Sequence, residues 1–252
     1  MRIRGKSINL FLMDGTASGR IKCTLANWTG LAYKIPRTEL DKCKERDDLK
    51  QSGVYFLFGI SDKTGENVVY IGQAGVRKNG EGILFRLQEH KRNPDKDYWT
   101  EAVVFTTSNN SFGPTEISYL ENRFCNLATE SNRYIVKNGN DPTPGNVTEE
   151  KESELEEFID YAKIVMGTFG HRIFEPVVDI PPEPSVVPVD ADVEPMLYLK
   201  TTKANARGRR TNEGFVVFKD STVSTNPTKS CPDTILHLRK LYAEKITTDV
   251  LT

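Results

Sequence analysis

The amino-acid sequence predicts an α+β fold, in which a small antiparallel sheet is flanked by amphipathic helices. Two apolar runs, 53–60 and 68–72, lie on either side of a polar, glycine-containing stretch and predict a β-hairpin. Over 114–127 the apolar residues instead recur at the three- to four-residue spacing of a helix.

The N-terminal segment, residues 1–49, predicts a small accessory unit. Residues 7–13 have the pattern of a strand, and a glycine-containing turn leads into a second strand at about 20–35. Pro36 and the polar run after it predict a short helix over 37–50. A hairpin and one helix are too small to be stable alone.

The following elements predict the core of the main domain. Gly53–Ile60 is nearly all apolar, as in a central strand covered on both faces, and Val68–Gly72 is its hairpin partner. A third strand is expected at 102–107, between helical patterns over 81–92 and from Pro114 onward. These elements predict three antiparallel strands with helices packed on them.

The main domain is expected to end with a long acidic helix. Residues 132–146 are loop-like, with two glycines and two prolines, and the helix follows from about Thr148. Apolar residues line one side of this helix. The predicted main domain therefore covers residues 50–172.

The remainder predicts a linker and a second, small α/β domain. Residues 173–195 are rich in proline and acids, which is typical of an extended linker. Residues 196–252 form the second domain, with strands at 196–199 and 214–218 and a helix near 233–244.

Composition indicates a globular protein of the cytoplasm. The chain is 37% hydrophobic and 27% charged, and no uncharged apolar run approaches the roughly 18 residues that span a membrane. Asp14 soon interrupts the apolar stretch after the basic start, so no secretory signal is expected. The four cysteines show no paired spacing, which favours reduced thiols.

The net charge of −1 gives no overall argument for nucleic-acid binding. The charges are nevertheless segregated, because residues 173–199 carry acids and no Lys or Arg, whereas basic residues gather from Lys200 onward. A second basic cluster consists of Arg77, Lys78, Arg86, Lys91, Arg92 and Lys96. Such clusters can hold phosphates; the alternative is an ordinary solvated surface.

Five features occur in an informative order along the chain. They are Gly53-Val54-Tyr55, Tyr70-Ile71-Gly72, Arg86, His90 and Glu121, the last three on predicted helices. In this order they resemble the GIY-YIG nuclease family, over about residues 50–147. The resemblance implies a three-stranded antiparallel sheet with helices on it, and hydrolysis of DNA phosphodiester bonds.

The C-terminal segment carries a second resemblance. Leu197-Tyr198-Leu199, Ala206-Arg207-Gly208 and the run from Glu213 to Val217 resemble an uncharacterised domain found fused after GIY-YIG modules, here in shortened form.

The nuclease resemblance assigns the charged residues. Phosphodiester hydrolysis needs an activated water and relief of negative charge in the transition state. Glu121 would be the single protein ligand of Mg²⁺, which accepts few carboxylates and keeps several waters, and Mn²⁺ would substitute. Arg86 would contact the scissile phosphate, and His90, one turn later, would bind the same phosphate or move a proton. The alternatives are a rim glutamate and two exposed helix residues.

The resemblance also makes Tyr55 the general base, while Tyr70 orients the water or the phosphate. A phenol with a pKa of about 10 is a poor base unless cations or a metal-bound water favour the phenolate, and the alternative is a buried aromatic pair. Each tyrosine is expected to lie near the other strand's glycine, so that Gly53 and Gly72 permit close approach.

An asparagine completes the family pattern by fixing nearby backbone. Asn132, Asn138, Asn140 and Asn146 all compete for this role, and Asn138 is favoured. Arg77, Lys78 and Arg92 are expected to bind substrate together with the two glycines.

These observations predict a metal-dependent endonuclease that acts on DNA, with no small-molecule cofactor beyond the metal and no membrane. The alternative is a catalytically silent fold that binds nucleic acid or recruits a protein. The DNA target, a role for RNA and the oligomeric state stay open.

Overall fold

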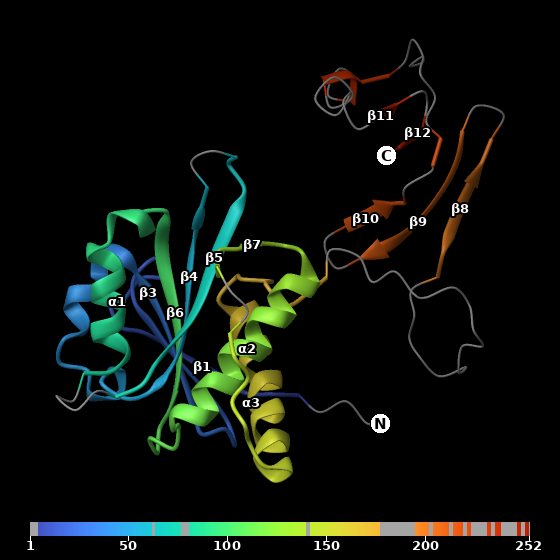
Figure 1. Cartoon of the computed structure of the whole chain (residues 1–252). Coiled ribbons are helices and arrows are strands. Elements are labelled where there is room, and N and C mark those ends of the chain that lie inside the picture. Colours follow the sequence, from blue (N-terminus) through green and yellow to red (C-terminus); the bar gives the residue numbers. More distant parts are fainter. Residues whose placement is uncertain are drawn as a thin grey trace. The chain divides into compact units, whose positions relative to one another are not determined.

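A computed structural model describes residues 5–61, 64–76, 81–139, 142–176, 195–201, 204–211, 214–218, 221–222, 231–232, 235–237, 246–247 and 250–251. The chain divides into two compact units, Met1–Val177 and Val178–Thr252 (Figure 1). Most of the predicted linker lies outside the described residues.

The first unit is built on one sheet of seven strands, in the order β1-β2-β3-β6-β4-β5-β7. The strands are β1 (Ile8–Leu12), β2 (Ile21–Leu25), β3 (Gly30–Pro36), β4 (Gly53–Ile60), β5 (Asn67–Ala74), β6 (Trp99–Thr107) and β7 (Ile135–Val136). Neighbours are antiparallel, except that β7 runs parallel to β5.

The expectation of a three-stranded sheet beside a separate hairpin is therefore wrong. β3 pairs with β6 along its whole length, from Gly30 opposite Thr107 to Pro36 opposite Glu101. This pairing satisfies backbone groups on the edge of β6 that would otherwise remain open. The N-terminal strands thereby extend the same sheet.

The segment expected to be one strand over 20–35 is two strands, β2 and β3. The chain reverses between them near Asn27, whose φ of 60° lies in the left-handed region that asparagine tolerates. The tip of the turn, Ala26-Asn27, carries one turn-forming residue, the asparagine, and no Gly or Pro.

Helices cover both faces of this sheet (Figure 1). On one face, α1 (Ile83–Arg92) and the 3₁₀ helix η1 (Arg37–Cys43) pack against Tyr55 and Leu57. On the other face, α2 (Pro114–Ser131) and α3 (Glu149–Thr168) pack against Val54 and Phe56. β4 is thus buried on both sides, as its apolar run predicts. Two shorter 3₁₀ helices are η2 (Asp47–Leu49) and η3 (Pro94–Lys96).

The second unit contains a three-stranded antiparallel sheet in the order β10-β9-β8. Its strands are β8 (Leu197–Lys200), β9 (Asn205–Thr211) and β10 (Gly214–Val217), and a separate pair is formed by β11 (Ile246–Thr247) and β12 (Val250–Leu251). β8 and β10 match the predicted strands, whereas β9 comes from a basic segment without a strand pattern. Of the predicted helix near 233–244, residues 235–237 are helical and the others lie outside the described residues.

Candidate active site at the edge of strand β5

Tyr55 of β4 and Tyr70 of β5 lie together on the face of the sheet that α1 covers. Their ring centroids are 6.3 Å apart, and each ring lies 5.4 Å from the imidazole of His90 on α1. Tyr55 is fully buried, whereas Tyr70 is half-buried. The three rings form one cluster between the sheet and the helix.

Gly72 makes room for this cluster. It lies opposite Tyr55 in the β4–β5 register, and a Cβ atom at this position would come within 2.4 Å of the Tyr55 hydroxyl oxygen. The tyrosine can occupy its place because residue 72 has no side chain.

The expectation that each tyrosine lies near the glycine of the other strand is wrong for Tyr70 and Gly53. The register that pairs Tyr55 with Gly72 necessarily pairs Tyr70 with Leu57, and Gly53 with Ala74. Gly53 is instead buried against the Phe105 carbonyl oxygen, which a Cβ atom would approach to 2.3 Å. This position supports a packing role for Gly53 rather than contact with a substrate.

His90 is buried, with 4% of its surface exposed, so it is not simply a solvated helix residue. Its Nε2 atom lies 2.7 Å from the hydroxyl of Tyr55. Burial lowers the pKa of His90 to about 4, and the positive charges of Lys96 and Arg86 add to this effect. The imidazole is therefore neutral at pH 7, and we assign Nε2 as the acceptor of the Tyr55 hydrogen bond.

Arg86 lies one turn before His90 on α1 and belongs to the same cluster. Its Nη1 lies 2.7 Å from a carboxylate oxygen of Glu89, which positions the guanidinium. The pKa of Arg86 is raised chiefly by this hydrogen bond, and the interaction with Tyr55 adds to it. In turn, burial raises the pKa of Tyr55, while Arg86 acts in the opposite direction.

Glu121 reaches the cluster from α2, on the opposite side of the sheet. Burial raises the pKa of Glu121, whereas hydrogen bonding with Gln73 of β5 and the charge of Arg86 lower it. Its own charge adds to burial in raising the pKa of Tyr70. Gln73 also donates to the Ser118 hydroxyl of α2 over 3.1 Å. The carboxylate therefore lies at the edge of β5, in electrostatic contact with residues of the α1 layer.

The Asn138 side chain completes the backbone hydrogen bonding of this edge. β7 pairs with β5 only at Val68 and Val69. Beyond that point the Asn138 side chain replaces a strand, because its Oδ1 accepts from the Ile71 N–H (3.1 Å) and its Nδ2 donates to the Ile71 carbonyl (2.7 Å). This double contact lies between Tyr70 and Gly72, and it fixes the backbone of Ile71.

Lys96 is a cluster member that sequence reasoning did not assign to the site. It ends η3, and its Nζ lies 3.1 Å from the centroid of the Tyr70 ring. Burial lowers the pKa of Lys96 to about 8, and the charge of Arg86 contributes. The only sequence signal was its place in the second basic cluster, since the contact depends on how η3 turns back after α1.

The other predicted substrate contacts lie elsewhere or outside the described residues. Arg77, Lys78 and Asn140 are not among the described residues. Arg92 is exposed at the end of α1, where its charge lowers the pKa of Asp41 after the larger effects of Lys91. Asn146 is exposed.

Metal binding at this site would depend on one carboxylate. In the described part of the chain, no group of three or more His, Cys, Asp or Glu side chains is placed to hold a metal ion. A half-buried glutamate next to a cation fits Mg²⁺, which binds through one or two carboxylates and retains waters, better than it fits zinc.

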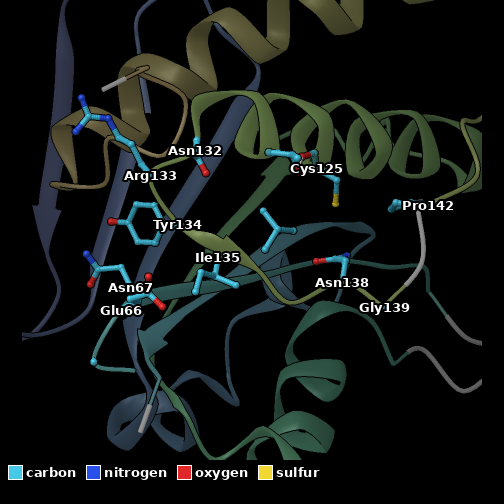
Figure 2. Close-up of a pocket in the computed structure, with 13 residues that line it drawn as sticks. Glu66, Asn67, Cys125, Asn132, Arg133, Tyr134, Ile135, Asn138, Gly139 and Pro142 are labelled. Carbon is cyan, nitrogen blue, oxygen red and sulfur yellow. Dashed lines mark hydrogen bonds between the residues drawn. The ribbon is translucent and has the colours of Figure 1, made fainter. Parts of the chain in front are cut away.

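A pocket of about 780 Å³ adjoins the site (Figure 2). Its walls come from the turn that leads into β5 (65–67), from Cys125 and Thr129 of α2, and from residues 132–136, 138, 139 and 142. Asn138 belongs both to this wall and to the edge of β5. Tyr55, Tyr70, Arg86 and Glu121 do not line the pocket.

Comparison with known proteins bears on the C-terminal unit alone. Residues 197–250 match a family described as a domain of unknown function (DUF4357). No curated protein and no solved structure matches the chain. No helix among the described residues is long and apolar enough to cross a membrane, and all four cysteines are free thiols.

Proposed function

We propose that the first unit is a metal-dependent endonuclease of the GIY-YIG type, which hydrolyses phosphodiester bonds in DNA in the cytoplasm. One observation carries this proposal. Tyr55, Tyr70, Arg86 and Glu121 come from four different elements, β4, β5, α1 and α2. The two tyrosine rings nevertheless lie 6.3 Å apart at the edge of β5, and Arg86 and Glu121 affect the pKa values of both.

Glu121 is the residue that would hold Mg²⁺, or Mn²⁺ in its place. When bound, such an ion lowers the pKa of a water ligand and neutralises charge on the phosphate. Arg86 then steadies a phosphate oxygen with a charge-assisted hydrogen bond. Lys96, beside Tyr70, supplies a further cation to the same phosphate.

Tyr55 acts in this proposal without first becoming a free phenolate. Its hydroxyl accepts a proton from the attacking water while passing its own proton to Nε2 of His90, 2.7 Å away. The water oxygen forms a bond to phosphorus, the bond from phosphorus to the leaving sugar oxygen breaks, and that oxygen takes a proton from solvent. The negative phosphate favours protonation of His90, whose pKa is lowered to about 4 in its absence.

A nicking assay on supercoiled plasmid, with Mg²⁺ and with chelator, tests this proposal. Glu121→Ala should abolish nicking while DNA binding persists. The matched control is Glu130→Ala, an exposed glutamate on the same helix, which should cut like the parent protein. Robust nicking by Glu121→Ala would contradict the role of its carboxylate.

A second candidate is a nucleic-acid-binding module that does not cut. It is favoured by the pairing of Arg86 with Glu89, which occupies part of the guanidinium that a scissile phosphate needs. Absence of nicking together with a salt-dependent gel shift would select this candidate.

A further inference from the structure

The three-stranded sheet of the second unit has two chemically different faces. Residues alternate between the faces of a strand, and paired residues share a face. The register places Leu197, Leu199, Phe215 and Val217 on one face. It places Tyr198, Lys200, Asn205 and Arg207 on the other, which we term the basic–aromatic face.

The basic–aromatic face is open to solvent at its β8 edge. Tyr198 is 75% exposed, and Lys200, Asn205 and Arg207 are exposed as well. Tyr198 lies directly opposite Arg207 across β8 and β9, and Lys200 lies opposite Asn205. Arg209 continues this face toward β10 but is buried. The exposed part thus combines one aromatic ring with two cations.

The local charge favours an anionic partner. Residues 195–222 contain six Lys or Arg against two acids, although the whole chain has a net charge of −1. An exposed tyrosine among cations on a sheet matches what single-stranded nucleic acid requires, namely a surface for base stacking and cations for the backbone phosphates. A duplex keeps its bases stacked on one another and cannot use the ring in this way.

We propose that the basic–aromatic face binds single-stranded nucleic acid, with a base stacked on Tyr198 and the adjacent phosphates held by Lys200 and Arg207. This assigns an activity to the second unit that does not depend on cleavage by the first. An endonuclease with such a unit would be brought to DNA that contains single-stranded segments.

Fluorescence anisotropy of the full-length chain tests the proposal, in chelator so that no cleavage occurs. The probes are a labelled single-stranded oligonucleotide of about 20 nucleotides, longer than the roughly 4–16 nucleotides that one OB-fold covers, and the matching duplex. We expect tighter binding of the single strand. Tyr198→Ala should weaken single-strand binding roughly five- to hundredfold, as expected for loss of one stacked base.

The chain offers a matched control for charge. Arg207 and Arg210 lie on the same strand, are both exposed, and face opposite sides of the sheet. Arg207→Glu should weaken binding and reduce the slope of log affinity against log salt by about 0.7 for each lost phosphate contact. Arg210→Glu makes the same charge change and should leave the slope unaltered.

Three results would overturn the proposal: equal losses in the two arginine variants, unchanged binding by Tyr198→Ala, or a preference for the duplex that Tyr198→Ala does not alter. Circular dichroism verifies that each variant is folded. Because the assay needs no cleavage, it can succeed even if the plasmid assay fails, and the reverse also holds.

Discussion

At the scale of single residues, the candidate site depends on Gly72, which has no side chain. Gly72 leaves the space into which the Tyr55 ring fits, and the buried ring has His90 at its hydroxyl. Gly72, the last residue of Tyr70-Ile71-Gly72, therefore makes room for Tyr55, the last residue of Gly53-Val54-Tyr55. The two tripeptides form one structural unit.

Replacing this glycine should damage stability and activity together. Gly72→Ala forces a methyl group against the Tyr55 hydroxyl, and overpacking of this kind costs about 1–3 kcal/mol. Urea denaturation and plasmid nicking measure the two effects. Gly139→Ala is the control, because a Cβ atom there meets nothing within 4 Å. Equal behaviour of the two variants would show that the ring adapts freely.

His90 should make stability depend on pH in a defined window. Its pKa is lowered from 6.5 to about 4, so between these values the unfolded chain binds a proton that the native state does not. Stability is therefore complete above about pH 6.5 and falls as the pH decreases toward 4, by at most about 1.4 kcal/mol per pH unit.

Comparison of the parent protein with His90→Gln isolates this contribution, since all other titrations cancel in the difference. The difference between the urea midpoints at pH 7.5 and pH 5 should be larger for the parent protein than for His90→Gln. Parallel losses in the two proteins would mean that His90 does not titrate as proposed.

Glu121 should lower stability at the site where it supports function. Burial raises its pKa, so the ionised carboxylate is disfavoured in the folded state at neutral pH. Glu121→Gln should then raise the melting temperature at pH 7 but not near pH 4, where the carboxyl is protonated, and it should abolish nicking. The control Glu130→Gln should change stability by no more than about 0.5 kcal/mol. A melting temperature lowered at pH 7 would contradict this argument.

At the scale of elements, the edge of β5 is completed by a side chain rather than by a strand. β7 is only two residues long, and Asn138 then supplies the donor and the acceptor that Ile71 needs. α1 adds Arg86 and His90 on one helical face, because residues four apart are neighbours on a helix. The edge of β5, α1 and α2 meet near Arg86 and Glu121.

Asn138→Ala should open this edge. Loss of the two hydrogen bonds leaves backbone groups of Ile71 unpaired and costs about 1–3 kcal/mol. Hydrogen exchange of the Ile71 amide should accelerate in Asn138→Ala and less in Asn138→Asp, which keeps the acceptor. Asn146→Ala, at another of the candidate asparagines, should leave this amide unchanged. Slow exchange in all three variants would refute the role of Asn138.

At the scale of the whole molecule, the two units differ in their cores. The first buries large side chains on both faces of its sheet, whereas several large apolar residues of the second unit's described strands are exposed. Both tryptophans of the chain, Trp28 and Trp99, lie in the first unit. Their fluorescence therefore reports on the first unit, whereas far-ultraviolet circular dichroism reports on both.

The two signals should not coincide during urea unfolding. We expect circular dichroism to show an early change at lower urea, from the second unit. Leu57→Ala, in the core of the first unit, should lower the free energy of unfolding reported by fluorescence by about 2–5 kcal/mol. The early change in circular dichroism should stay in place. Superimposable curves would show that the chain unfolds as one cooperative unit.

Much of this organisation could be predicted from local patterns. The bounds of β4 follow from its apolar run, and Pro114 marks the start of α2. Other features depend on contacts between distant residues. The pairing of β3 with β6 and the approach of Lys96 to Tyr70 leave no mark on the local pattern, and the split of residues 20–35 depends on one left-handed asparagine.

Local order along the chain establishes which residue types are available for chemistry, and on which strands and helices most of them lie, because these properties depend on neighbouring residues. The seven-stranded sheet, the glycine opposite Tyr55 rather than Tyr70, and the closure of the β5 edge by Asn138 emerge from the folded chain alone. Register and packing are set by burial and hydrogen bonding between residues far apart in sequence, which no local pattern records.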